Sequence, residues 1–325
     1  MGTETAHIHL ISDDQVSSLL SMPETIGMMR ILFLELAGGR AKITDRTVVV
    51  MENGEDSVLY MPGYLPGIRG LGIKVISVFP SNIPRNIPTA SAKVLLLDPE
   101  TGMPEALLDG AKITAMRTAA VSALAADILA APGADKLGIF GAGKQGKSHI
   151  EAIREVRKLK SVHILDVDRS RCESLIAEIP ESWKQGTDFS IADTSDEIIG
   201  ECDMIMTVTT SLTPVFDGAN LRPGTHVGAV GSFRPEVREI DEAAIRRMRL
   251  FVDSRKDALE EAGDLIIPLR QGIIQESDIL GELSDLVSGT VTGRTSADDI
   301  TFFKSVGMAL EDIIVARSIA DRLVK

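Results

Sequence analysis

The arrangement of hydrophobic positions divides the chain into two patterns. Short apolar runs, separated by Gly, Pro and Asn and without helical patterns between them, occur at 47–51, 57–61, 73–79, 92–97 and 103–108. Such runs are typical of strands, and strands in direct succession predict an antiparallel or mixed sheet. From residue 136 onward, apolar runs alternate with helical patterns. This alternation predicts a doubly wound parallel sheet, and therefore a separate α/β domain.

Helical patterns accompany both sheets. After a short strand at 7–11, two capping boxes that begin at Ser12 and Ser21 predict two helices. An alanine-rich pattern at 111–131 predicts the helix that connects the domains. Apolar residues at helical spacing predict a final helix at 298–324, which we place on the first domain. The fold class is therefore α/β, with a doubly wound domain (119–299) inserted in a smaller α+β domain (1–118 plus 300–325).

A glycine-rich motif follows the first strand of the second pattern. Gly141-Ala142-Gly143-Lys144-Gln145-Gly146 comes directly after the apolar run 136–140 and opens a helical pattern. In a βαβ unit this spacing permits a tight turn at Gly141, close approach of a pyrophosphate at Gly143, and close helix–strand packing at Gly146. Helix N-termini also favour phosphate charge. The motif predicts a dinucleotide site, and it makes 119–299 a Rossmann dinucleotide-binding domain.

An acidic residue distinguishes this motif from a second glycine-rich stretch. Asp166 closes the next apolar run, twenty residues after Gly146, where a carboxylate is expected to bind the ribose hydroxyls. The stretch 67–72 is also glycine-rich, but no strand precedes it and an extended run follows. We therefore assign the dinucleotide site to 141–146. The alternative for this region is an ordinary strand–turn–helix whose glycines serve packing.

The composition narrows the range of functions. The 325-residue chain carries a net charge of −13, which argues against nucleic-acid and anionic-membrane partners because both require basic surface. No segment resembles a membrane span or a signal peptide. Cys172 and Cys202 are isolated, which favours a reducing cytoplasm. The histidines show no spacing typical of a metal site, so we expect no metal.

Three basic residues have apolar neighbours in the sequence. Lys74 lies within a strand pattern, Arg117 lies among small residues of the connecting helix, and Arg46 begins a strand. Buried cations require partners. A substrate carboxylate is one such partner, since Arg binds carboxylates bidentately and Lys supplies a point charge or a proton. The alternative is an internal salt bridge or a side chain extended along the surface.

Several blocks of the sequence resemble the ornithine cyclodeaminase/mu-crystallin family. The resemblance covers essentially the whole chain, and the most specific blocks are Arg117-Thr118-Ala119-Ala120 and 301–312. Further matching blocks lie at 60–64, 72–75, 109–116, 141–146 and 231–241. The resemblance implies an NAD(P)-dependent enzyme that acts on the bond between the α-carbon and nitrogen of amino or imino acids. It also implies a homodimer formed through the non-Rossmann domain.

The resemblance also implies residue roles. Arg46, Lys74 and Arg117 match the family's substrate-carboxylate and catalytic residues, the same three that their sequence context indicates. The cofactor-binding residues would be Thr118, Gly141, Gly143, Lys144, Gln145, Gly146, Asp166, Arg169, Val230 and Ser232.

One position departs from the family's cyclodeaminase and alanine dehydrogenase branches. Those branches carry an aspartate, taken as a base or amine contact, where this chain has Phe233, and a lysine where it has Val237. Phenylalanine neither accepts a proton nor pairs with an ammonium group. Reduction of a cyclic imine needs that group less, because the iminium carbon is already an electrophile. Ketimine reductases and pyrroline-2-carboxylate reductases of the family share the Gly-Ser/Ala-x-x-Pro form that this chain has at 231–235.

The expected activity is therefore reduction of a cyclic ketimine carboxylate, such as Δ1-pyrroline-2-carboxylate or Δ1-piperideine-2-carboxylate, to L-proline or L-pipecolate. The alternatives are amino-acid dehydrogenation or ornithine cyclodeamination, and a non-catalytic crystallin-like protein that binds NAD(P)H and a small ligand. Asp166 favours NAD(H) because it repels a 2′-phosphate, whereas NADP(H) is possible if Arg169 and Arg171 hold that phosphate. The sequence leaves the ring size of the substrate and the direction of the reaction open.

Overall fold

The computed structural model describes residues 8–323 and divides the chain into two compact units. Unit 1 comprises the chain up to Arg117 and the chain from Met308 onward, and unit 2 comprises Thr118–Gly307. The boundary falls within helix α3 (Gly110–Leu129). No helix in the described part of the chain is both long enough and apolar enough to cross a membrane.

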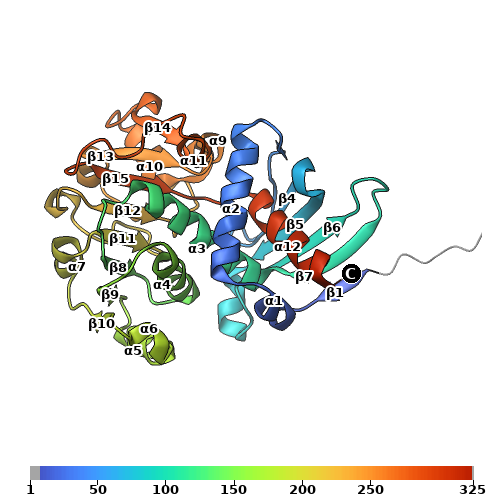
Figure 1. Ribbon diagram of the computed structural model, residues 1–325, viewed down its shortest axis with the longest axis horizontal. Helices are drawn as coiled ribbons and strands as arrows, with labels where there is room; N and C mark the ends of the chain where they lie inside the picture. The colour runs from blue at the N-terminus through green and yellow to red at the C-terminus, as the bar shows by residue number, and fades with distance from the viewer. Residues whose placement is uncertain (1–7, 324–325) are drawn as a thin grey trace, which may run out of the picture. The chain divides into compact units, whose positions relative to one another are not determined.

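Unit 1 is built on a mixed sheet with strand order β1-β7-β6-β5-β4-β2, and β3 also pairs with β4 (Figure 1). The β1–β7 pair is parallel and the other pairs are antiparallel. The predicted antiparallel or mixed sheet is therefore confirmed. Its strands are β1 (His9–Ile11), β2 (Lys42–Ile43), β3 (Thr47–Val50), β4 (Ser57–Leu65), β5 (Gly70–Val78), β6 (Ala90–Leu97) and β7 (Pro104–Asp109). Its helices besides α3 are α1 (Asp13–Leu19), α2 (Met22–Ala37) and α12 (Ala309–Leu323), with 3-10 turns at Pro66–Ile68 and Pro80–Arg85.

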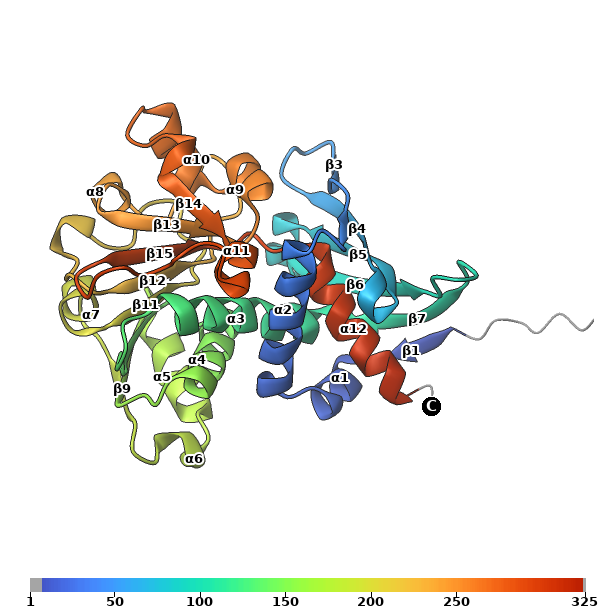
Figure 2. The same cartoon turned by 45° about the horizontal axis from the view of Figure 1, so that its top comes forward.

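Helix α12 packs against β4, β5 and β6 and against α2 (Figure 2). Two glycines allow this close approach. A Cβ on Gly63 would lie 2.7 Å from the Leu310 side chain, and one on Gly70 would lie 3.1 Å from that of Ile313. The face of β5 that carries Gly70, Gly72 and Lys74 is consequently buried. The sequence argues against a dinucleotide site at 67–72. In the structure this stretch forms the connection from β4 into β5.

Unit 2 is a parallel sheet with strand order β10-β9-β8-β11-β12-β15-β13-β14. The predicted doubly wound α/β class is confirmed. Its strands are β8 (Lys136–Phe140), β9 (Ser161–Leu165), β10 (Asp188–Ile191), β11 (Met204–Thr207), β12 (His226–Ala229), β13 (Met248–Val252), β14 (Ile279–Glu282) and β15 (Ile300–Lys304). Its remaining helices are α4 (Lys144–Val156), α5 (Arg169–Glu178), α6 (Glu181–Lys184), α7 (Ser195–Glu201), α8 (Glu242–Ile245), α9 (Arg255–Glu261), α10 (Gly263–Arg270) and α11 (Leu283–Ser288), with 3-10 turns at Gly218–Asn220 and Glu276–Asp278.

The strand order reverses between β8 and β11, since β9 lies on one side of β8 and β11 on the other. In open parallel sheets, ligands bind beyond the carboxyl ends of the strands at such a reversal. The glycine-rich motif follows β8 directly, so the fold places it at the expected binding position.

The predicted final helix at 298–324 is wrong over its first part. Residues Ile300–Lys304 form β15, which pairs with β12 and β13, and α12 begins at Ala309. The domain boundary expected at residue 300 accordingly lies at Gly307 in the structure. A strand buried on both faces is a continuous apolar run, and here Phe302 happens to lie at helical spacing from the apolar residues of α12.

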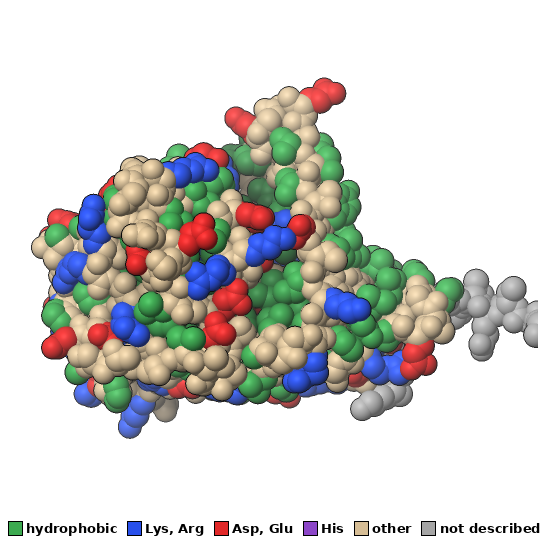
Figure 3. Space-filling model, turned by 90° about the horizontal axis from the view of Figure 1, so that it is seen from above, with side chains coloured by type: hydrophobic (Ala, Val, Ile, Leu, Met, Phe, Trp, Pro, Cys, Tyr) green, Lys and Arg blue, Asp and Glu red, His purple; other side chains and the backbone are tan. Residues whose placement is uncertain are grey.

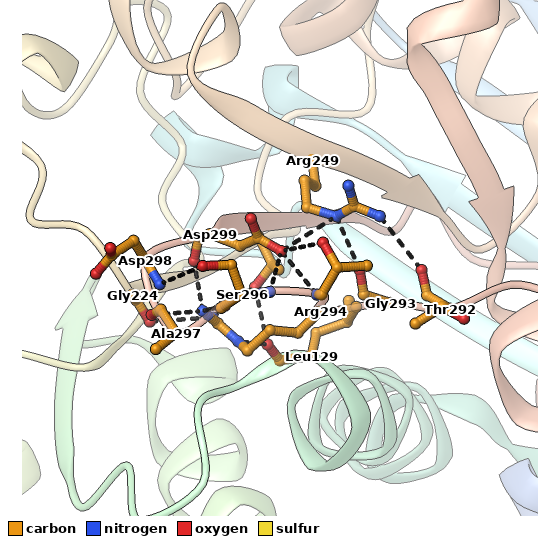
Figure 4. A network of polar contacts seen from close by, with 12 residues as sticks. Leu129, Gly224, Arg249, Thr292, Gly293, Arg294, Ser296, Ala297, Asp298 and Asp299 are labelled. Atoms are coloured by element: carbon orange, nitrogen blue, oxygen red, sulfur yellow. Dashed lines mark hydrogen bonds and ion pairs between the residues drawn. The ribbon is translucent and has the colours of Figure 1, made fainter.

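Arg294 fixes the irregular segment before β15 (Figure 4). Its guanidinium donates to the carbonyl oxygens of Leu129, at the end of α3, and of Gly224, at 2.9 and 3.0 Å. It also donates to the carbonyls of Ala297 and Asp299 within its own segment. One side chain thus satisfies backbone acceptors from three separate parts of unit 2.

We predict that Arg294→Met lowers the free energy of unfolding by about 3 kcal/mol, because several half-buried carbonyls lose a charged donor. Urea unfolding would measure the change. Arg294→Lys keeps the charge but lacks the planar fork, so its loss should be intermediate. Equal stabilities for Arg294→Met and the wild type would contradict this assignment.

Candidate active site

The glycine-rich loop has the backbone features of a phosphate site. Gly141 has a φ of 106°, and a Cβ there would lie 2.9 Å from the carbonyl oxygen of Val208. A Cβ on Gly146 would lie 2.3 Å from the carbonyl oxygen of Gly141, so both positions require glycine. A Cβ on Gly143 meets no protein atom within 4 Å. Gly143 is the N-cap of α4 and Lys144 is the first helical residue, so the open space lies at a helix N-terminus, where an anion is favoured.

Asp166 follows β9 and is fixed by the backbone. Its Oδ2 accepts a hydrogen bond from Ala142 N at 2.8 Å, and its Oδ1 accepts one from Asp168 N at 3.0 Å. The carboxylate therefore lies against the glycine-rich loop. Arg169 forms ion pairs with Asp193 and Glu173, and Arg171 forms one with Asp168. Both arginines are thus paired with carboxylates at the surface, where their side chains are 60% and 64% exposed.

Beyond β11 and β12, the loops are held by a buried carboxylate that the sequence did not indicate. Glu239 is fully buried and accepts hydrogen bonds from the Thr207 hydroxyl, from Thr209 and from Gly231 N. Burial raises the pKa of this carboxyl. The anchored segment includes Val230, whose N–H donates to Thr207 O, and leads into Ser232. Glu239 therefore shapes the edge to which the sequence assigns two cofactor residues.

A buried ion pair between Asp264 and Lys304 supports Glu239. Asp264 accepts hydrogen bonds from Glu239 N and Ile240 N, and its Oδ2 lies 2.8 Å from Lys304 Nζ. The side chains of Asp264 and Lys304 are both fully buried. A buried pair with hydrogen bonds to the surrounding backbone fixes local geometry, since moving either partner leaves an uncompensated charge.

In unit 1, Lys74 and Arg117 are brought together by two acidic residues of α12. Lys74 is 1% exposed, and its Nζ donates to Asp312 Oδ1 at 2.7 Å and to Thr114 Oγ1 at 2.8 Å. The Arg117 guanidinium donates to Glu311, and its Nε lies 3.3 Å from Asp312 Oδ2. The internal salt bridges that the sequence left open as an alternative are therefore present.

The electrostatic environment of Lys74 is unusual for a lysine. Burial lowers its pKa to about 8, and the Asp312 carboxylate acts in the opposite direction. A lysine in this range exchanges protons readily near neutral pH, which is a property of functional lysines rather than of surface ones. The cluster thus contains two cations, Lys74 and Arg117, and Lys74 is also able to move a proton.

Arg46 lies directly before β3, and its place relative to Lys74 follows from extending the strand register. Thr47 is opposite Tyr60, and Met61 is opposite Lys74, so continuing the β3–β4 register by one residue places Arg46 opposite Met61. Arg46 and Lys74 are then two strand spacings apart, about 10 Å between backbones, within the combined reach of their side chains. Thr118, the residue after Arg117 on α3, is buried.

Sequence reasoning missed Glu311, Asp312 and Thr114. A signal for the two acids was present, because they stand side by side among Leu310, Ile313 and other apolar residues of α12. Adjacent carboxylates in an apolar stretch of a helix require buried cations. Matching them with Lys74 and Arg117 needs the pairing of segments far apart in the chain.

The fold and these residues define a protein of two units. One is of the Rossmann dinucleotide type, and the other carries a buried cluster of two cations and two carboxylates. The family model for the ornithine cyclodeaminase/mu-crystallin family matches residues 8–325, and the chain belongs to that family. The resemblance noted in the sequence is confirmed.

Individual relatives are similar over nearly the whole chain. A Delta(1)-pyrroline-2-carboxylate reductase of Bacillus cereus is 37% identical over 97% of both chains. The Thermococcus litoralis Delta(1)-pyrroline-2-carboxylate reductase, solved with NADH and L-proline, is 37% identical with a TM-score of 0.93 over 98% of both chains. An archaeal alanine dehydrogenase dimer with bound NAD is 27% identical, with a TM-score of 0.91 over 98% of this chain and 96% of its own.

We predict that Gly143→Ala weakens NADH binding at least tenfold, roughly 1.4 kcal/mol, while the stability of the apoprotein is unchanged. The new methyl group meets no protein atom, so it obstructs only a bound pyrophosphate. Fluorescence titration with NADH and thermal unfolding would measure the two effects. Gly200→Ala is the matched control, because its Cβ also meets no atom and Gly200 lies in α7 of the same unit. Unchanged affinity in Gly143→Ala would contradict the assigned phosphate position.

Proposed function

We propose that this protein is an NAD(P)H-dependent reductase of cyclic ketimine carboxylates, an oxidoreductase acting on C=N bonds. Its products would be L-proline from Δ1-pyrroline-2-carboxylate or L-pipecolate from Δ1-piperideine-2-carboxylate. The observation that carries the proposal is the buried cluster of Lys74 and Arg117 bridged by Asp312. The relatives named as pyrroline-2-carboxylate reductases support the same substrate class.

The basic residues of unit 1 suit a substrate that carries a carboxylate next to a C=N bond. In this proposal Arg117 and Arg46 bind the carboxylate, since guanidinium groups match its two oxygens. Arg117 is oriented by Glu311 and Asp312, which fixes the plane of its fork before substrate arrives. Such preorganisation lowers the cost of binding and orients the imine carbon.

Lys74 then supplies the proton. Reduction of an imine adds one hydride to carbon and one proton to nitrogen, and bound NAD(P)H supplies the hydride. Two hydrogen-bond acceptors of the Lys74 ammonium lie among the described residues, Asp312 and Thr114, which leaves its third N–H for the ring nitrogen. After donation, the amine regains a proton from solvent, which a pKa of about 8 allows near neutral pH.

The loop after β12 favours an imine over a charged amino acid. Phe233, which stands where the dehydrogenase and cyclodeaminase branches have an aspartate, is 51% exposed and offers no charge to a substrate ammonium group. Amino-acid dehydrogenation and ornithine cyclodeamination are therefore the second candidates, supported by the similarity to an alanine dehydrogenase. A crystallin-like protein that binds NAD(P)H without turnover is the third.

For the cofactor we propose NAD(H) over NADP(H). Asp166 is fixed beside the glycine-rich loop by two backbone N–H groups, where its charge would repel a 2′-phosphate. Arg169 and Arg171 are already paired with carboxylates. The observation in favour of NADP(H) is a cavity beside the loop that is lined by Lys144, Lys147 and Arg171.

We further propose a homodimer formed through unit 1. Apolar side chains are exposed on α2 and on the hairpin of β3 and β4, namely Ile31, Leu34, Val48, Val49, Val50 and Tyr60. Figure 3 shows hydrophobic side chains along the projecting hairpin. Contiguous exposed apolar surface marks an interaction site. The related alanine dehydrogenase is a dimer, which supports this assembly.

We place the protein in the cytoplasm. Cys172 and Cys202 are both buried and neither forms a disulfide, which is typical of a reducing compartment. The substrate is a small imino acid, and the net charge of −13 disfavours nucleic-acid and anionic-membrane partners.

We predict NADH oxidation, followed at about 340 nm, with Δ1-pyrroline-2-carboxylate or Δ1-piperideine-2-carboxylate and not with pyruvate plus ammonia. NADPH tested in parallel should give a lower kcat/KM. Lys74→Ala should lower kcat/KM about 100-fold or more, because the proton donor is lost, while NADH still binds unit 2. Turnover with pyruvate and ammonia alone would favour the dehydrogenase alternative. Full activity of Lys74→Ala would refute the assigned role.

We predict that Val49→Glu converts the dimer to monomer at micromolar concentration, because β3 would carry a buried charge at the interface. Light scattering would measure the mass. Met103→Glu is the control, since Met103 is 51% exposed in the same unit but lies outside the proposed surface. A wild-type protein that is monomeric throughout would disprove the proposed assembly.

A further inference from the structure

Asp312 lies at the centre of the buried cluster that it forms with Lys74, Arg117 and Glu311, and it contacts both cations. One of its oxygens accepts from Lys74 Nζ and lies 3.2 Å from the Thr114 hydroxyl, and the other lies 3.3 Å from Arg117 Nε. Lys74 comes from β5, Arg117 from α3 and Asp312 from α12. A single carboxylate thus joins three elements, and it is fully buried.

The surroundings leave few other sources of compensating charge for Lys74. The strand residues that flank it in register are the apolar Met61 on β4 and Val94 on β6. The charged groups that act on Lys74 are Asp312 and Glu311 from α12, which favour its charged form, and Arg117 from α3, which disfavours it. Asp312 is the nearer acid, with a direct hydrogen bond of 2.7 Å.

We propose that Asp312 is a positioning residue for the proposed reduction: it holds Lys74 protonated beside Arg117 and aims both cations at the substrate, without contacting the substrate itself. This inference rests on the proposed function for its catalytic consequence. Its physical content, that Asp312 sets the charge of Lys74, is independent of any reaction.

The consequence follows from the energetics of buried charge. Without Asp312, burial and the neighbouring guanidinium both favour the neutral form of Lys74. The lysine would then lose its proton at a lower pH, and with it the ability to protonate an imine nitrogen. Activity in such a variant should fall at alkaline pH and recover at acidic pH, where Lys74 is charged again.

The direct test is the titration of Lys74 by NMR, with lysine labelled with carbon-13 at Cε and the signal assigned by its loss in Lys74→Arg. The wild-type Lys74 should titrate with a pKa of about 8. In Asp312→Asn the midpoint should fall by about one unit or more. An unchanged midpoint would overturn the inference, whatever the outcome of the activity assays.

The second test is the pH dependence of kcat/KM from about pH 6 to about pH 10. Asp312→Asn should move the alkaline limb to lower pH by the same amount as the NMR midpoint, and Asp312→Glu should restore the limb. NADH affinity should be unchanged. Loss of activity by a constant factor at every pH would indicate a merely structural role and overturn the proposal.

Two further variants complete the experiment. Glu105→Gln is the matched control. Glu105 lies on β7 and pairs at 2.5 Å with Arg317 of α12, the helix that carries Asp312, but it is not part of the Lys74 cluster. It should leave both the Lys74 midpoint and the pH profile in place. If Asp312→Asn does not fold, Thr114→Val decides: losing the second acceptor of the ammonium should shift the midpoint in the same direction by less, and no shift would overturn the proposal.

Discussion

The cost of taking charge out of water governs both units of this protein. In unit 1, Lys74 and Arg117 are buried with Glu311 and Asp312, so two cations and two anions share one desolvated space. In unit 2, Lys304, Asp264 and Glu239 form a similar buried group at the carboxyl edge of the sheet. Each charge is tolerable because its partners are in place. Removing one partner would leave the others as uncompensated buried charges. These groups therefore fix the relative positions of β-strands and loops that packing alone would define more loosely.

The features that depended on local sequence were predictable. The glycine spacing at 141–146, with Asp166 twenty residues later, located the strand–loop–helix unit proposed to bind the dinucleotide, because every member lies in one βαβ unit. The succession of strands in unit 1 followed from the same kind of local pattern. The C-terminal boundary did not, because a strand buried on both faces has no alternation, and β15 was therefore predicted as the start of a helix.

Of the site residues that pair across the tertiary structure, the sequence indicated only the cations. Lys74 and Arg117 could be recognised as cations in apolar surroundings, yet their partners come from a helix more than 190 positions later in the chain. A sequence shows that a buried charge requires compensation, but not which residue supplies it. The two interpretations of these cations, salt bridge or substrate site, are also not exclusive, since the acids that neutralise them can orient them at the same time.

The attachment of Asp166 to the glycine-rich loop has a consequence for how cofactor preference can change. In the proposed preference for NAD(H), the carboxylate that would repel a 2′-phosphate is the same one that accepts the Ala142 N–H. Exchanging it for a neutral residue would remove that repulsion and also free the loop proposed to receive the pyrophosphate. One side chain would thus serve both cofactor selectivity and loop order, so a variant that accepts the other dinucleotide would need a new hydrogen-bond acceptor for the Ala142 N–H. A change of cofactor preference in such a chain would therefore need two replacements rather than one.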